Sequence, residues 1–458
     1  MISFGLLGGF CDHLEIRITG LSEEGFSFRV PKKIEKAACL EICFFDFSAD
    51  CYRKVQLAEK EREMKLTEET PFFFIYSVWT KNGEYREQVK RLVTDYGNYI
   101  SLKLAGDDAY LSEKMVGYPA ELDEVYAESF EEQKKEWFSC VGDGIQECRN
   151  TWEHKKWNIT DFTEFELAIT IDRPELYYDF LQKDWTRFCH DYWKNNFLEH
   201  HTLSKKRVTR IYIGNQFCHN LFPKKKLLFQ VLEKALENNL AVTLAFSYIR
   251  NHLLEEIDEL LQELEVWCQS REKEAGKDQE EIIVNDWAMP ILLQGKPHLK
   301  PVLGVLLNKR RKDVRLPYKQ GIGNHVDSLA ENNLNCGFYQ DYLKNTFDIQ
   351  RFEFESCGYK VTIPDGHHSL HLPFFQTNTS QYCTLYAVCR YGDRGKQKLT
   401  ENCPRYCNKK VFLYPKHLKM VGRYNSLFGY DEKILWDEKQ LQDYLEQGID
   451  RIVVNVSL

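Results

Sequence analysis

The sequence predicts a mixed α/β protein that has a parallel sheet in its C-terminal half and an all-β domain before it. From Arg207 onward, strand-like and helix-like segments alternate, which is typical of βα units in a parallel sheet. Ahead of that region, short alternating strands with turn residues come first, and a stretch with helical periodicity follows them. We therefore expect an all-β domain over 1–120, a helical bridge over 121–206 and an α/β barrel over 207–458.

The composition is that of a large globular protein. The chain has 458 residues, of which 43% are hydrophobic and 14% aromatic, and at about 150 residues per domain this length predicts two or three domains. The net charge of −8 gives no support for a protein that coats nucleic acid. No apolar segment approaches the roughly 20 residues that span a bilayer, so we expect no membrane partner. The 15 cysteines, with no basic stretch before the short apolar run at the N terminus, favour the reducing cytoplasm.

The N-terminal 120 residues are expected to form a small β-barrel. Residues 14–18 and 26–30 alternate between apolar and polar side chains around a turn. The segment GLSEEGFSFRV resembles the strand–turn–strand of PilZ-type barrels, which implies a domain that senses a ligand. The motif normally carries Asp or Asn where this chain has Gly20, and no arginine lies between Met1 and His13. We therefore do not expect this motif to bind a cyclic dinucleotide.

The remaining elements follow from periodicity. In the bridge we expect a charged helix over 128–138 and a second helix that begins at Pro174, which suits a first helical turn, and runs to Tyr192. In the barrel region we expect helices at 226–236 and 253–264, a charged loop at 271–280, and strands at 208–213, 240–246, 282–284, 302–306, 351–355, 359–363 and 451–456. This number of strands favours a closed barrel over a doubly wound sheet.

Segments of the region 207–458 resemble the peptidase U32 family. They are Ile213-Gly214-Asn215, the pair Asn285-Asp286 after the third strand, the glycine-containing strand from Pro301 to Lys309, and the final strand from Asp450 to Val453. The resemblance implies a TIM-like α/β barrel. Several members of this family carry an iron–sulfur cluster that supports oxygen-independent hydroxylation of RNA bases or of quinone precursors. The resemblance therefore also implies such a cluster in this chain.

Four late cysteines are the candidate metal ligands. Cys383, Cys389, Cys403 and Cys407 have the spacing C-x5-C-x13-C-x3-C, and thiolates are ligands of iron–sulfur clusters and of zinc. The resemblance implies a [4Fe–4S] cluster. Zinc and free thiols remain alternatives, although the C-x2-C pairs of a zinc ribbon are absent. Some relatives draw one ligand from elsewhere in the barrel, and Cys218 is then the substitute.

Other polar residues are candidate substrate contacts. Chemistry in barrels lies at the carboxyl ends of the strands, and arginine can grip a carboxylate or phosphate with two bonds. The candidate catalytic residues are Asp286 and Arg423, and the candidate substrate-binding residues are Asn285, Arg394, Asn425 and His368. The alternatives are that Asp286 caps the turn that follows it, that the arginines form structural salt bridges, and that His368 belongs to a surface loop.

Three functions are therefore considered. The first is an iron–sulfur protein that modifies RNA or a small aromatic substrate without oxygen. The second is a U32-type peptidase, for which the sequence offers no convincing nucleophile or hydrolytic metal. The third is a non-enzymatic regulatory protein whose N-terminal domain senses a ligand. The sequence has no P-loop, GxGxxG, HExxH or GxSxG motif, which speaks against nucleotide, Rossmann, zincin and α/β-hydrolase chemistry.

Overall fold

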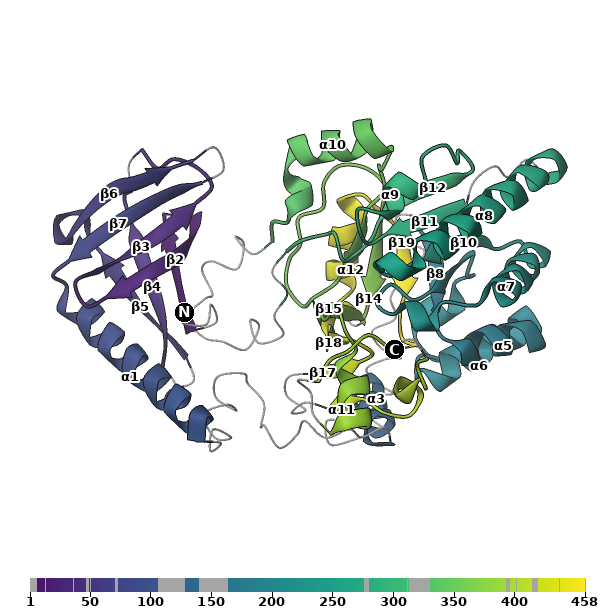
Figure 1. Ribbon diagram of the computed structural model, residues 1–458, viewed down its shortest axis with the longest axis horizontal. Helices are drawn as coiled ribbons and strands as arrows, with labels where there is room; N and C mark the ends of the chain where they lie inside the picture. Colours follow the sequence, from purple (N-terminus) through teal and green to yellow (C-terminus); the bar gives the residue numbers. More distant parts are fainter. Residues whose placement is uncertain are drawn as a thin grey trace. The chain divides into compact units, whose positions relative to one another are not determined.

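A computed structural model of the chain divides into two compact units (Figure 1). Unit 1 comprises Met1–Asp123 and Arg315–Ala330, and unit 2 comprises Glu124–Val314 and Glu331–Leu458. The residues described are 6–12, 14–35, 37–46, 49, 51–70, 73–105, 128–139, 164–275, 280–310, 312, 330–392, 396–400, 402–413, 419–435 and 437–457.

Unit 1 contains an antiparallel sheet of seven strands in the order β5-β4-β1-β2-β3-β7-β6. The strands are β1 (Leu7–Cys11), β2 (Leu14–Ser22), β3 (Gly25–Val30), β4 (Leu40–Asp46), β5 (Cys51–Leu57), β6 (Arg62–Glu69) and β7 (Phe74–Thr80). The sequence analysis missed the long helix α1 (Gly83–Ala105), whose Tyr85, Val89 and Leu92 join the core of this sheet at helical spacing. Within the described part of the chain, β5 and β6 do not pair, so the predicted closure into a small barrel is not seen there.

Unit 2 is built on eight parallel strands. They are β8 (Glu166–Ile171), β9 (Arg210–Gly214), β10 (Ala241–Ala245), β11 (Glu280–Val284), β12 (Leu299–Leu303), β13 (Glu353–Glu355), β14 (His368–Leu372) and β19 (Ile449–Val454). Their order is β12-β11-β10-β9-β8-β19-β14-β13. The two end strands meet at one bridge, where the Leu303 N–H donates to the Arg351 carbonyl at 3.0 Å. The sheet is thus a nearly closed parallel barrel whose strands follow one another in chain order.

The barrel begins earlier in the chain than predicted. Strand β8 lies in the segment expected to be a helical bridge, so the sheet starts at Glu166 and not near Arg207. Pro174 does begin a helix, but the apolar face is divided between α5 (Pro174–Gln182) and α6 (Trp185–Asn195). The division falls before Asp184, whose side chain accepts a hydrogen bond from the Arg187 N–H and so caps a new helix.

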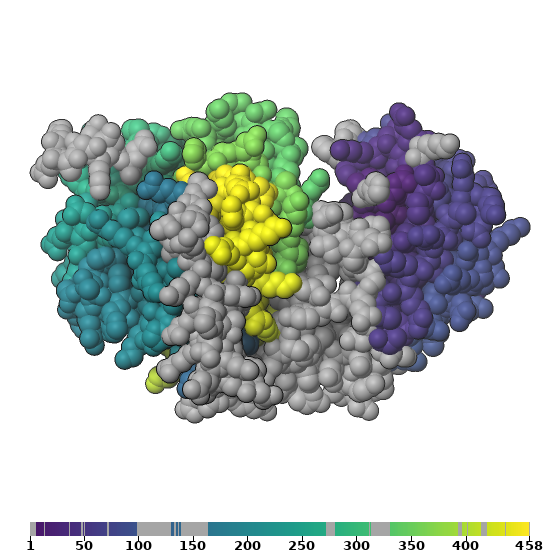
Figure 2. Space-filling model, turned by 180° about the vertical axis from the view of Figure 1, so that it is seen from behind, coloured from purple at the N-terminus to yellow at the C-terminus, as the bar shows by residue number. Residues whose placement is uncertain are grey.

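Helices follow most of the strands and cover the outside of the barrel (Figure 1). They are α7 (Lys225–Glu237), α8 (Leu254–Ala275), α9 (Met289–Leu292), α10 (Gly337–Phe347) and α12 (Glu438–Glu446). Figure 2 shows the yellow C-terminal segment, which includes α12, on the surface of unit 2. Helix α8 extends into the predicted charged loop, because Arg271 packs over Trp267 and pairs with Glu280 at 2.6 Å. The strand predicted at 359–363 is irregular chain.

An antiparallel sheet is inserted between β14 and β19, and the sequence analysis did not predict it. Its strands are β15 (Phe374–Thr379), β16 (Phe412–Leu413), β17 (Met420–Arg423) and β18 (Ser426–Tyr430), in the order β15-β18-β17-β16. Helix α11 (Thr384–Tyr391) lies between its first two strands. The predicted helix at 128–138 forms α3 (Glu128–Ser139) and packs on this sheet, where Trp137 stacks on Tyr430 with the ring centroids 5.3 Å apart.

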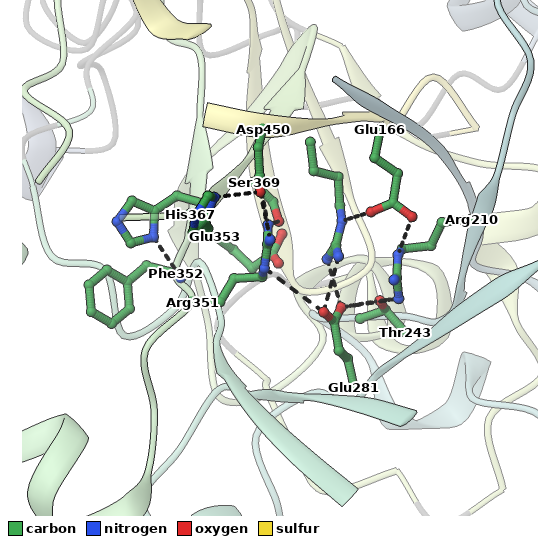
Figure 3. A network of polar contacts seen from close by, with 12 residues as sticks. Glu166, Arg210, Thr243, Glu281, Arg351, Phe352, Glu353, His367, Ser369 and Asp450 are labelled. Atoms are coloured by element: carbon green, nitrogen blue, oxygen red, sulfur yellow. Dashed lines mark hydrogen bonds and ion pairs between the residues drawn. The ribbon is translucent and has the colours of Figure 1, made fainter. Parts of the chain in front are cut away.

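A network of ion pairs fills the inside of the barrel near the ends where its strands begin (Figure 3). Arg451 on β19 donates to Glu166 on β8 at 2.6 Å and to Glu281 on β11 at 2.6 and 3.0 Å. Arg210 on β9 reaches the same two carboxylates at 2.9 and 3.3 Å. Burial opposes ionisation of Glu281, but Arg210 and Arg451 outweigh it and lower the pKa of this carboxyl to about 2. The network therefore links four strands electrostatically.

Replacing Glu281 by glutamine should destabilise the barrel by about 3 kcal/mol, because the change leaves the buried guanidinium of Arg451 with an incomplete counter-charge. A lowered pKa in the folded state adds stability at pH values above about 4.5, and that stability is lost as the pH falls toward 2. Chemical denaturation from pH 7 to pH 3 should therefore show a smaller acid-induced loss in Glu281→Gln than in the wild type. The exposed Glu237→Gln is the matched control, and equal pH profiles for all three proteins would contradict the prediction.

Candidate metal centre

Four cysteines line one cavity at the edge of the barrel where the strands end. Cys218 follows β9, whereas Cys383, Cys403 and Cys407 lie in the inserted segment between β15 and β16. The cavity encloses about 530 Å³ of empty space, which includes its open mouth. The part that admits the centre of a water molecule is only about 30 Å³. Its size therefore suits a compact group better than a large organic substrate.

A glycine and an asparagine place Cys218 in this cavity. Gly214 ends β9 with φ of +108°, and a Cβ there would lie 2.5 Å from the carbonyl oxygen of Ala245. Only glycine fits such a turn without strain. The next residue, Asn215, accepts hydrogen bonds at 2.9 Å from the backbone N–H groups of Phe217 and Cys218. The Gly214-Asn215 pair that resembled the U32 pattern thus has a physical role, which is to turn the chain and fix the backbone of Cys218.

Cys383 is the N-cap of α11. Its sulfur accepts a hydrogen bond from the Tyr386 N–H at 3.3 Å, and as a thiol it donates to the Tyr424 carbonyl at 3.0 Å. A helix N terminus favours negative charge. The same position therefore suits both the protonated thiol and a thiolate bound to a metal.

Arg423 fixes the backbone of another of these cysteines. Its Nε and Nη2 donate to the Cys407 carbonyl at 3.0 and 2.9 Å, and the arginine is buried. Arg405, between Cys403 and Cys407, has φ of +56°, so the chain turns sharply between the two thiols. Arg423 was predicted to contact substrate, but its hydrogen bonds to the Cys407 carbonyl give it a positioning role. Among the described residues it forms no salt bridge, which was the alternative considered for it.

Three of the four thiols, those of Cys218, Cys383 and Cys407, have raised pKa values and so hold their protons at neutral pH. Burial, with a smaller contribution from Cys407 and Cys403, raises the pKa of Cys383 to about 12, against the opposing hydrogen bond from the Tyr386 N–H. Burial likewise raises the pKa of Cys407 to about 11, against the opposing effect of Arg423. The pKa of Cys218 is raised well above its usual value, first by burial and then by Cys407 and Cys383. A metal that binds here must displace these protons, so its apparent affinity should increase with pH.

Cys389 does not line the cavity. It lies in α11 six residues after Cys383, which corresponds to roughly 9 Å along the helix axis and to a different side of it. Helical geometry therefore separates the two sulfurs that the sequence analysis grouped together. Cys218, which it considered as the substitute, lines the cavity instead. Among the described residues, no group of three or more His, Cys, Asp or Glu side chains is arranged to hold a metal ion, so these thiols surround the cavity without meeting at one point.

Asn285 and Asp286, the predicted pair at the end of β11, form hydrogen bonds with backbone groups. Asp286 accepts hydrogen bonds from the Ala288 and Met289 N–H groups at 2.9 and 3.0 Å, and also from the Ile249 N–H. These contacts match the alternative that Asp286 caps a turn. Asn285 donates to the Phe246 carbonyl at 2.7 Å and accepts from the Leu306 N–H at 3.1 Å. It thereby joins the ends of β10, β11 and β12.

The remaining candidates lie in different places. Asn425 is close to the cysteines and donates to the Tyr248 hydroxyl at 2.9 Å and to the Ser380 carbonyl at 2.7 Å. His368 is the first residue of β14, so it lies at the opposite end of the barrel. It is buried and stacks on Phe352, with ring centroids 4.8 Å apart, and burial lowers its pKa to about 4. It is therefore not the surface-loop residue considered as its alternative. Arg394 lies outside the described residues.

Tyr248 is a site residue that the sequence analysis missed. It follows β10, and its hydroxyl donates to the Gln381 carbonyl at 2.8 Å. Its side chain lines the cysteine cavity and two larger cavities beside it. A polar aromatic residue just after a parallel strand was the available signal, because that position faces the edge where barrels bind ligands.

Comparison of the chain with family models, with curated proteins and with solved structures finds no match. The resemblances to U32 and PilZ sequences therefore stay predictions. Among the described residues, no helix has the length and apolar character that a membrane span requires.

Replacing Asp286 by asparagine should lower the free energy of unfolding by about 1–2 kcal/mol, because one of its two acceptor oxygens becomes a donor that faces backbone N–H groups. Denaturant unfolding measures the change. Asp341→Asn, at an exposed position in α10, is the control that removes the same charge and should be close to neutral. Unchanged stability in Asp286→Asn would contradict its role as a cap.

Proposed function

We propose that Cys218, Cys383, Cys403 and Cys407 bind an iron–sulfur cluster, and that the protein uses it to modify a substrate held beside the cluster. The observation that carries this proposal is the convergence of four thiols, from two distant parts of the sequence, on one compact cavity. Buried cysteines are common as small apolar residues. Such a role does not explain why four of them share a cavity.

The residues around the thiols suit a charged metal–thiolate group. The helix N terminus at Cys383 and the guanidinium of Arg423, which partly opposes the effect of burial on the pKa of Cys407, both favour negative charge on sulfur. A cluster distributes its thiolates over several irons, whereas zinc gathers four ligands at about 2.3 Å from one ion. The cluster is proposed ahead of zinc because of the family resemblance and because the C-x2-C pairs of a zinc ribbon are absent from the sequence.

A cluster bound by four thiolates would supply electron transfer and would leave no iron open to substrate. The substrate then needs a separate place within reach. A larger cavity adjoins the cysteine cavity, and the part of it that admits the centre of a water molecule is about 880 Å³. The residues that line both cavities are Cys403, His219, Asn220, Thr400 and Tyr248. One wall of the larger cavity contains Phe222 stacked on Phe246, with ring centroids 4.3 Å apart. Such a wall suits a planar aromatic substrate or a nucleic-acid base, which agrees with oxygen-independent hydroxylation of RNA or of a small aromatic compound.

The test compares two cysteine variants of the full-length protein purified without oxygen. Cys218→Ser should lose most of the bound iron and sulfide and the associated visible absorption, because it removes a ligand. Cys389→Ser is the matched control, since its sulfur lies outside the cavity, and it should keep the iron and sulfide content of the wild type. Iron, acid-labile sulfide and zinc are measured on each protein.

The outcomes are distinct. A colourless wild-type protein with one zinc per chain would keep the metal site but overturn the cluster. Loss of iron in Cys389→Ser, with retention in Cys218→Ser, would overturn the ligand set. Wild-type protein that binds neither iron nor zinc after anaerobic reconstitution would overturn the metal centre.

A further inference from the structure

A second cavity at the same edge of the barrel has the chemistry of an anion-binding site. The part of it that admits the centre of a water molecule is about 480 Å³, and the cavity lies where β11, β12 and β15 end. Its basic side chains are Lys309, Arg310 and Lys312, and none of the described residues that line it is acidic. The other lining residues are mainly amides and hydroxyls, among them Asn308, Gln376, Thr377 and Thr379. In a protein with a net charge of −8, such a cavity is a local concentration of positive charge.

In the described part of the chain, one of the three cations has a carboxylate partner and the other two have none. Lys312 pairs with Glu355, and both side chains are almost completely buried. Among the described residues, neither Lys309 nor Arg310 forms an ion pair with a carboxylate. Arg310 donates through Nη2 to the Glu355 carbonyl only. The cavity thus retains two positive charges that the described part of the protein does not neutralise.

Two residues of the cavity lining each carry a buried polar atom that has no partner among the described residues. The atoms are Nη1 of Arg310, a donor, and Oδ1 of Asn308, an acceptor. Asn308 is only 4% exposed, and its Nδ2 is already bound to the Glu353 carbonyl at 3.1 Å. Unsatisfied buried groups are costly and uncommon in native proteins. Because both residues line the cavity, a ligand bound there is a candidate partner for these atoms.

We propose that this cavity binds a small organic anion that carries a phosphate or a carboxylate next to a hydroxyl or amino group. The anionic group pairs with Arg310 and Lys309, where arginine offers a forked donor. The neighbouring hydroxyl or amino group donates to Oδ1 of Asn308. None of these residues lines the cysteine cavity, so binding here is independent of the metal centre.

The experiment is isothermal titration of the full-length protein with glycerol 3-phosphate, with D-glycerate and with glycerol. At least one of the two anions should bind saturably, and more weakly as salt is added, whereas uncharged glycerol should not bind. Binding of the phosphate alone or of the carboxylate alone identifies the anionic group. Cys218→Ser should bind the anion as the wild type does, which separates this site from the metal centre.

Three variants test the assignment. Arg310→Gln should weaken binding about tenfold, because it removes a charged hydrogen bond, and the exposed Lys309→Gln should weaken it about threefold. Lys224→Gln removes the same charge from the neighbouring cavity and should have no effect. If Arg310→Gln fails to fold, Lys309→Gln decides. Absence of saturable binding of both anions at millimolar concentration, or equal weakening by Lys309→Gln and Lys224→Gln, would overturn the proposal.

Discussion

The parallel direction of the eight barrel strands determines where the candidate sites lie. In a parallel sheet all the carboxyl ends meet at one edge, so Cys218 after β9, Tyr248 after β10 and Asn285 after β11 become neighbours although they are far apart in sequence. The antiparallel insertion between β14 and β19 contributes the other three cysteines at that same edge. Residues that come early in a strand, such as His368, lie at the other end of the barrel.

The two ends of the barrel differ in how their polar groups are paired. Where the strands begin, Arg451, Arg210, Glu281 and Glu166 neutralise one another in a dense network. Such a network fixes strands at their mutual positions but leaves few groups for a ligand. Where the strands end, the thiol of Cys383 keeps its proton, and a buried donor of Arg310 has no partner among the described residues. The charged groups of the network at the beginning of the strands thus neutralise one another, whereas the cavities at the other end retain groups that a ligand can bind.

The sequence predicted the positions of many helices and strands, but it predicted less well which residues come together in space. Apolar periodicity placed α7, β9, β10 and β11 well, because a buried strand or helix face must repeat at a fixed spacing. It missed β8, whose short apolar run was included in the helical bridge, and α1, whose apolar face is narrow within a charged helix. Three of the four cysteines that it grouped line one cavity, but Cys389 does not, because spacing along the chain does not show on which side of α11 a sulfur lies. Cys218 lies too far away in sequence for spacing to group it with them.

Tyr248 forms part of the wall of three cavities at once, and this shared wall has a thermodynamic consequence. Its hydroxyl is fixed by Asn425 and Gln381, both of which belong to the inserted segment. A ligand that displaces the ring from one cavity alters the shape of the other two. Linkage requires any resulting change in affinity to be reciprocal. Occupancy of one cavity thus affects the other two only where the ligand moves this ring, and an anion held by Lys309, Arg310 and Asn308 alone leaves the cysteine cavity unchanged.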